Sequence, residues 1–140
     1  MRARILVIED NPANLELMRY LLQSFGHTVL AADDGLSGVA VARKERPDLV
    51  LCDVQLPHLD GPGVARVLKG DPTLCSIPLI AVTAFAMVGD RERMLQAGFD
   101  GYLPKPITPE TFLRDIEGFL RPELRRATQA ADTGRPPQPV

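Results

Sequence analysis

The chain of 140 residues has the length of one domain, and its hydrophobic share of 45% is enough to build a core without disulfides or metals. A formal net charge of −2 and an aromatic share of 5% argue against the basic, base-stacking surface of a nucleic-acid-binding protein. The longest stretch without a charge, residues 72–89, is broken by prolines and hydroxyl side chains, and no signal peptide is visible. We therefore expect a cytoplasmic protein without membrane insertion.

Short apolar runs alternate with amphipathic stretches along the chain, which is typical of alternating strands and helices. A β-branched run ends in Glu9, and the helix expected after it starts at Pro12, with Asp10 or Asn11 as its cap, and ends at Gly26. The expected strands span residues 4–9, 28–32, 49–53, 79–82 and 101–103, and the expected helices span residues 12–25, 37–46, 63–68, 89–96 and 109–120.

This alternation predicts an α/β fold with a doubly wound, five-stranded parallel sheet. The second strand ends in two alanines, whereas the other four strands end in polar side chains. These groups converge if the strand order is 2-1-3-4-5, a flavodoxin-like order with its switch point between strands one and three. We assign residues 1–121 to this domain. Residues 122–140 form an extension that we expect to be disordered after a short helical continuation.

The two cysteines, Cys52 and Cys75, lie in or beside apolar strand-like sequence. No spacing of Cys and His suits a zinc site. We expect both thiols to be buried, as small apolar side chains in a reducing compartment.

Polar side chains that can carry chemistry follow four of the expected strands. Glu9 and Asp10 follow the first strand, Asp53 ends the third, Thr83 ends the fourth and Lys105 follows the fifth. In an open parallel sheet these strand ends meet at one edge, where ligands bind. Each residue also has an ordinary explanation, such as a helix cap for Asp10 or a surface charge for the lysine. Their coincidence at one edge favours a site.

Three neighbouring carboxylates repel one another by roughly 4 kcal/mol per pair at about 4 Å, if the effective dielectric constant is near 20. A cation must offset this repulsion, and ligands that are all oxygen favour Mg²⁺. Lys105 can then hold an anion beside the metal, with Asp53 as the nucleophile that forms an aspartyl phosphate. The sequence has no Walker loop, so the phosphodonor is not ATP.

These residues stand in four segments, residues 5–11, 47–61, 80–84 and 101–106, beginning with Ile-Leu-Val-Ile-Glu-Asp-Asn. In this order and at these intervals the segments resemble the response-regulator receiver domain of two-component signalling, from about Arg4 to Leu120. The stretches 54–57 and 83–87 look most like single-domain regulators of the DivK type and like receivers attached to hybrid kinases.

The resemblance implies that Asp53 accepts a phosphoryl group from a sensor histidine kinase or a phosphotransfer protein. It implies that Mg²⁺ is bound by Asp10, by Asp53 and by the backbone carbonyl of Gln55, with Glu9 acting through water. Lys105 would pair with the phosphoryl oxygens.

The same resemblance implies a switch. Thr83 would turn its hydroxyl toward the phosphoryl group, where it also assists catalysis, and Tyr102 would rotate inward behind it. The Lys105–Pro106 peptide bond is expected to be cis. Phe85 and Met87 are the candidate partner surface, although an apolar run at this point could equally pack on the core.

The function expected from these features is that of a single-domain response regulator that binds a downstream protein target, as a monomer or a phosphorylation-driven homodimer. It would catalyse only its own phosphorylation and dephosphorylation. Three alternatives remain. A phosphatase of the haloacid-dehalogenase type needs a second Asp where this chain has Gln55. A receiver that has lost phosphorylation is the second. A fragment of a hybrid kinase is the third, although Met1 just before the first strand favours a free-standing protein.

Overall fold

The structure, a computed structural model, describes residues 3–84 and 88–120. Five strands form one parallel sheet in the order β2-β1-β3-β4-β5, which confirms the predicted α/β fold and strand order. The strands are β1 (Arg4–Ile8), β2 (Thr28–Ala32), β3 (Leu49–Asp53), β4 (Leu79–Thr83) and β5 (Gly101–Pro104).

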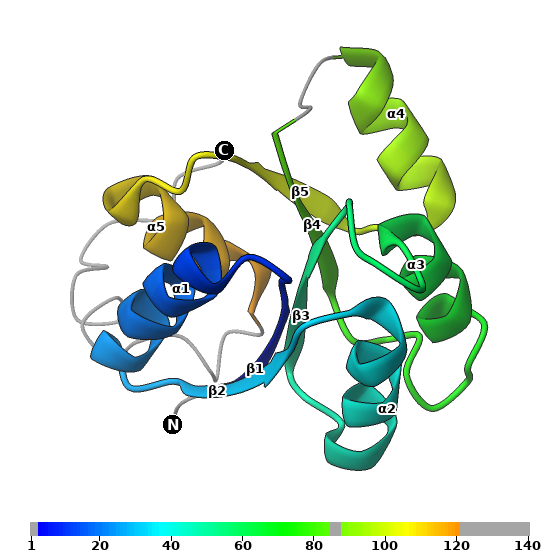
Figure 1. Ribbon diagram of the computed structural model, residues 1–140, viewed down its shortest axis with the longest axis horizontal. Coiled ribbons are helices and arrows are strands. Elements are labelled where there is room, and N and C mark those ends of the chain that lie inside the picture. Colours follow the sequence, from blue (N-terminus) through cyan, green and yellow to red (C-terminus); the bar gives the residue numbers. More distant parts are fainter. Residues whose placement is uncertain (1–2, 85–87, 121–140) are drawn as a thin grey trace, which may run out of the picture.

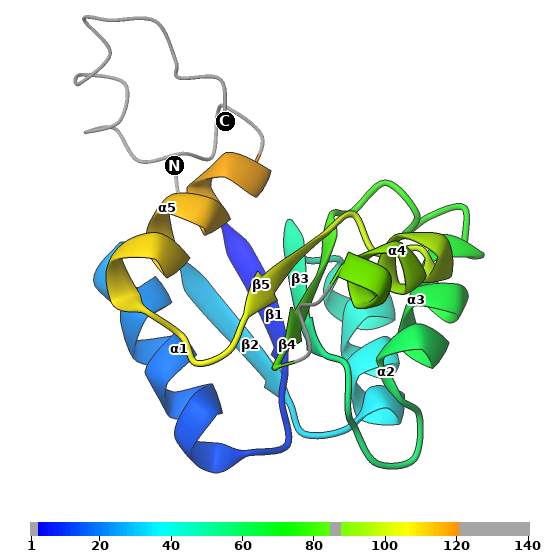
Figure 2. The same ribbon diagram turned by 90° about the horizontal axis from the view of Figure 1, so that it is seen from above.

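Helices cover both faces of the sheet (Figure 1). Helices α1 and α5 lie on one face, and α2, α3 and α4 lie on the other, as the second view also shows (Figure 2). Right-handed crossovers between parallel strands produce this arrangement, because the chain changes direction along the sheet after β2. The helices are α1 (Pro12–Ser24), α2 (Gly35–Glu45), α3 (Gly61–Lys69), α4 (Val88–Ala97) and α5 (Pro109–Phe119).

The sheet divides the core into two layers. Ile5 and Val7 of β1 pack with α1 and α5, while Leu6 and Ile8 pack with the helices of the opposite face. This alternation follows from the two-residue period of a strand, and a sheet covered on both faces needs apolar residues at every position. All four side chains are fully buried, and burial of each contributes about 1.5–3 kcal/mol to folding.

The caps of the helices explain where they begin. Asn11 accepts hydrogen bonds from the backbone N–H groups of Ala13 (2.9 Å) and Asn14 (3.1 Å), so Asn11 and not Asp10 caps α1. Helix α2 begins at Gly35, before the expected Ser37, because Asp34 accepts from the Ser37 N–H (2.8 Å). Hydrophobic periodicity could not show this turn, since its residues include a glycine and polar side chains.

The expectation of two buried thiols was wrong for Cys75. Cys52 is buried in β3, but Cys75 is exposed. The backbone N–H of Cys75 donates to the carbonyl of Asp71 (2.9 Å) in a turn that directs the preceding Leu74 into the core instead, with 2% of its surface exposed. One of two adjacent residues in such a turn faces solvent, and the larger apolar side chain takes the buried position.

Within residues 3–84 and 88–120, none of the helices has both the length and the hydropathy of a membrane-spanning segment. The expected C-terminal extension, residues 122–140, lies outside the described residues, as do Phe85 and Met87 of the candidate partner surface.

A substitution at Gly35 tests how closely α2 packs on the loop that follows β3. A Cβ atom at Gly35 would lie 1.8 Å from the carbonyl oxygen of Leu59, which is backbone and cannot rotate away. We expect Gly35→Ala to lower the free energy of unfolding by about 1–3 kcal/mol, measured by urea denaturation. Gly118→Ala is the control, because nothing lies within 4 Å of a Cβ there, and it should leave stability unchanged or raise it. Equal stability of the two variants would contradict this close approach.

Candidate functional site

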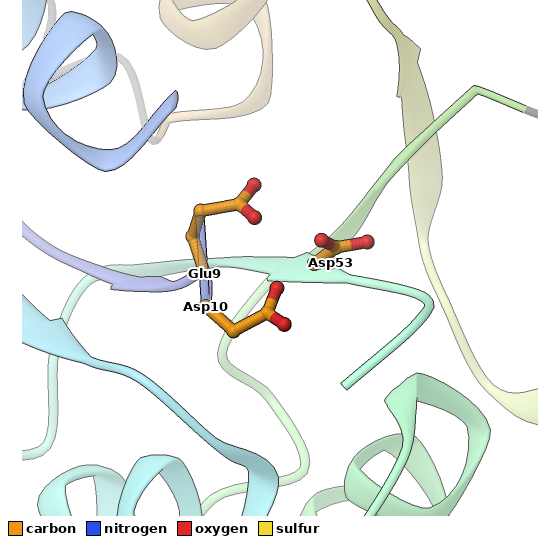
Figure 3. A group of neighbouring side chains, drawn as sticks. All are labelled: Glu9, Asp10 and Asp53. Carbon is orange, nitrogen blue, oxygen red and sulfur yellow. The ribbon is translucent and has the colours of Figure 1, made fainter. Parts of the chain in front are cut away.

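Three carboxylates meet at the carboxyl edge of the sheet. Glu9 and Asp10 follow β1, and Asp53 is the last residue of β3, the neighbour of β1. One oxygen atom from each of the three lies within 4.8 Å of the others. Figure 3 shows the carboxylates of Glu9 and Asp10 projecting from the end of β1 toward that of Asp53. The sequence-based expectation that these residues lie together agrees with this geometry.

The carboxylates line an open cleft with a volume of about 490 Å³. Thr83 and Ala84 from the end of β4 and Lys105 from the loop after β5 also line it, so all four polar strand ends reach one place. The first turn of α1 closes another side through Asn11, Pro12 and Asn14, and Gln55 completes the lining. Asn11 was predicted only as a helix cap, and Pro12 and Asn14 were not predicted as lining residues.

Lys105 supplies a positive charge in the cleft. Its Nζ lies 3.0 Å from Oδ2 of Asp53, to which it donates a hydrogen bond, and 3.2 Å from Oε1 of Glu9. Burial of the ammonium acts to lower its pKa, but the hydrogen bond and charge of Asp53, together with the charge of Glu9, outweigh it and raise the pKa of Lys105. The side chain therefore stays protonated and offsets part of the repulsion among the carboxylates.

Glu9 is the most deeply buried of the three acids, with 1% of its surface exposed. Its Oε2 accepts from the backbone N–H of Asn11 (3.2 Å), while Oε1 faces Lys105 at the distance of an ion pair without an aligned hydrogen bond. Burial, followed by the neighbouring carboxyl of Asp53, raises the pKa of Glu9 from 4.5 to about 7. In the absence of a metal ion, Glu9 is thus partly protonated at neutral pH.

Asp53 is held from two sides. Its Oδ1 accepts from the backbone N–H of Gln55 (3.1 Å), and its Oδ2 accepts from Lys105. The chain after β3 turns back so that the N–H of Gly61 donates to the carbonyl of Val54 (2.9 Å). A Cβ at Gly61 would lie 2.7 Å from Cα of Val54, so this return requires glycine. The result is a tight loop that keeps Gln55 beside the carboxylates.

The donor set fits a hard divalent cation. One carboxylate oxygen each of Glu9, Asp10 and Asp53 lies within 4.8 Å of the others, and Gln55 of the adjacent loop lines the same cleft. Among the described residues that line this cleft there is no His or Cys, so the ligands suit Mg²⁺ better than zinc or copper. A divalent charge would also offset the repulsion among the carboxylates, roughly 3.5 kcal/mol for a charged pair at 4.8 Å and an effective dielectric constant near 20.

Of the two residues expected to switch, Thr83 lines the cleft and Tyr102 is not among its lining residues. Thr83 is buried at the end of β4, where its carbonyl accepts from the N–H of Lys105 (2.8 Å). Tyr102 of β5 is half-buried against the core layer beneath α2, α3 and α4. The Lys105–Pro106 peptide bond, which joins β5 to the loop before α5, is cis.

A family model described as the response regulator receiver domain matches residues 5–117. This chain belongs to the response regulator receiver domain family. The polar-differentiation response regulator DivK of Brucella anthropi is 42% identical over 120 residues, which cover 86% of this chain and 98% of DivK. The predicted resemblance to the family and to DivK-type regulators is confirmed.

Solved structures agree with this assignment. The receiver domain of a sensor histidine kinase from Pseudomonas aeruginosa, with a magnesium ion coordinated in its active site cleft, is 37% identical with a TM-score of 0.78, over 85% of this chain and 98% of that domain. The chemotaxis response regulator CheY4 of Vibrio cholerae is 26% identical with a TM-score of 0.82, over 86% of this chain and all of that one. Receivers are signalling domains, so the chain belongs to a family of signalling domains.

The raised pKa of Glu9 predicts a pH dependence of stability. Between pH 4.5 and about 7 the folded, metal-free receiver retains a proton that the unfolded chain releases. The free energy of unfolding should therefore decrease as pH rises through this window, and Glu9→Gln should remove that part of the decrease. Urea denaturation in EDTA across the window measures it. The same slope for Glu9→Gln and wild type would show that the pKa of Glu9 is not raised.

Proposed function

We propose that this receiver accepts a phosphoryl group on Asp53 from a phosphohistidine on a sensor histidine kinase or phosphotransfer protein. The observation that carries the proposal is the arrangement around Asp53, a nearly buried carboxylate held by Lys105 in an open cleft with two further acids. A buried ion pair that only stabilised the fold would need neither the cleft nor the additional acids. Each extra carboxylate raises the electrostatic free energy of the folded state.

The transfer is an in-line displacement at phosphorus. An oxygen of Asp53 forms the new P–O bond while the P–N bond to the donor imidazole breaks, and the imidazole leaves with that electron pair. The carboxylate of Asp53 accepts a hydrogen bond from the Gln55 N–H on Oδ1 and one from the Lys105 ammonium on Oδ2. Both donors hold the nucleophile in one orientation.

Lys105 has a second role once the phosphoryl group arrives. Its Nζ lies between Asp53 and Glu9, so a small displacement would bring it to an oxygen of the transferred group. A fixed ammonium in a partly buried site stabilises the charge that develops there. Mg²⁺, bound by Asp10, Asp53 and the Gln55 carbonyl with Glu9 acting through water, would supply charge neutralisation for the phosphoryl oxygens.

Phosphorylation would then be transmitted through Thr83 and Tyr102. The hydroxyl of Thr83, on a residue that lines the cleft, would turn toward the phosphoryl group. Space beside β5 would open for Tyr102 to move inward, which biases the receiver between two conformations. The output would be a changed protein-binding surface, with Phe85 and Met87 proposed as part of it. Its partners would be the phosphodonor protein and a downstream target in the cytoplasm, with the receiver as a monomer or a phosphorylation-driven homodimer.

The haloacid-dehalogenase alternative requires a general acid two residues after the nucleophile, and Gln55 cannot donate a proton in that way. Sustained release of phosphate from simple phosphate esters, at a rate comparable to that of an enzyme, would favour the alternative over a receiver that modifies only itself.

Incubation with acetyl phosphate or phosphoramidate and Mg²⁺, followed by intact mass measurement, tests the acceptor. We expect wild type to gain one phosphoryl group and Asp53→Asn to gain none, because the amide is a poor nucleophile. Asp60→Asn is the matched control, since Asp60 caps α3 on the same loop and Asn also caps helices. EDTA should abolish the uptake in wild type. Uptake that persists in Asp53→Asn would place the acceptor elsewhere.

The switch is tested by substitution of Thr83. Thr83→Ala removes the hydroxyl but leaves Asp53 in place. This variant should therefore still accept the phosphoryl group, but the conformation of β5 should not change. We expect the amide NMR signals of residues 101–104 to move on phosphorylation in wild type and in Thr83→Ser, and to move much less in Thr83→Ala. Equal movement in the alanine and serine variants would remove the hydroxyl from the mechanism.

A further inference from the structure

His58 stands in the loop between β3 and α3, three residues beyond Gln55, in an unusual backbone conformation. Its φ angle is 69°, in the left-handed region, and the N–H of Leu59 donates to the carbonyl of Pro57 (2.8 Å) across it. This is a γ-turn of the strained form with a positive central φ. Residues other than glycine persist in such a conformation only where surrounding contacts hold them, although His adopts it more readily than most.

Two contacts with the start of α2 hold this turn. Nδ1 of His58 lies 3.1 Å from Oδ2 of Asp34, and the carbonyl of Leu59 packs directly on Gly35. Asp34 is itself fixed, because its Oδ1 accepts from the N–H (2.8 Å) and the hydroxyl (2.9 Å) of Ser37. Hydrogen bonds from Ser37 and then from His58 lower the pKa of Asp34, so the carboxylate stays charged.

Asp34 thus uses one oxygen to cap α2 and the other to hold the loop after β3. The loop is short, and hydrogen bonds close it at both ends. The N–H of Gln55 donates to Oδ1 of Asp53, and the N–H of Gly61 donates to the carbonyl of Val54. Movement of the turn at His58 would therefore displace Gln55, which lines the cleft beside the carboxylates.

We propose that the Asp34–His58 pair is a positioning clamp, which preorganises the loop of residues 54–60 so that the Gln55 carbonyl faces the metal position. The inference rests on the proposed function, since it assigns a role in Mg²⁺ binding to residues outside the cleft. Neither residue touches the metal position. They act by reducing the conformational freedom that the loop loses when the ion binds.

The effect is modest because the pair is partly exposed to solvent, with 64% of the His58 side chain accessible. Exposed pairs of this kind contribute little, so removal of the clamp should weaken Mg²⁺ affinity by only about three-fold. The same exposure makes His58 variants suitable for the test, because no core contact is lost.

Two substitutions of Asp34 separate the clamp from the helix cap. Asp34→Ser still caps α2 but has no group that reaches His58, whereas Asp34→Asn caps α2 and can donate through its amide to Nδ1 of the other imidazole tautomer. Titration of the full chain with MgCl₂, followed by calorimetry and by the Gln55 amide NMR signal, should show about three-fold weaker binding for Asp34→Ser and His58→Ala. Asp34→Asn should bind within about 1.5-fold of wild type.

The double variant Asp34→Ser/His58→Ala should bind no more weakly than either single variant, since both remove one interaction. Thermal unfolding without Mg²⁺ gives the purely structural contribution of each change. Wild-type affinity in Asp34→Ser and His58→Ala, or additive losses in the double variant, would overturn the clamp alone. A wild-type chain that binds no Mg²⁺ would overturn the proposed function together with the clamp.

Discussion

Repulsion among three carboxylates at one edge of the sheet is the constraint on which the site depends. Glu9, Asp10 and Asp53 present oxygens within 4.8 Å of one another, and Glu9 is almost fully buried. A fold tolerates this only with compensation. The structure compensates in two ways, with the ammonium of Lys105 in contact with two of the acids, and with a raised pKa for Glu9 that leaves this group partly neutral. A site with crowded carboxylates beside a fixed ammonium can bind a cation through the acids and an anion through the lysine.

The parallel sheet makes the crowding possible. Because every strand runs in the same direction, the residue after each strand emerges at the same edge, and the order of the strands decides which residues become neighbours. With β1 beside β3, β3 beside β4 and β4 beside β5, four segments separated along the chain deliver their polar residues to one cleft. The edge strand β2 supplies no lining residue to that cleft, and Asp34 after it caps α2 instead.

The loop between β3 and α3 connects the site to the rest of the molecule. Gly61 allows its tight return, and Gly35 allows α2 to approach it, because in both places a Cβ would meet backbone atoms. His58 joins the same loop to the cap of α2. At both glycines a side chain would displace the loop that carries Gln55.

The sequence by itself determined the alternation of strands and helices, the strand order and the set Glu9, Asp10, Asp53, Thr83 and Lys105. Hydrophobic periodicity and polar strand ends are local signals, and the rules for parallel sheets convert them into a topology. The sequence left open whether Asp10 or Asn11 caps α1, and it suggested a buried Cys75. Only the tertiary structure decided those points, the ion pairs of Lys105 and the contact between Asp34 and His58. Such contacts join residues far apart in the chain, and their geometry depends on how helices and loops pack, which no local pattern encodes.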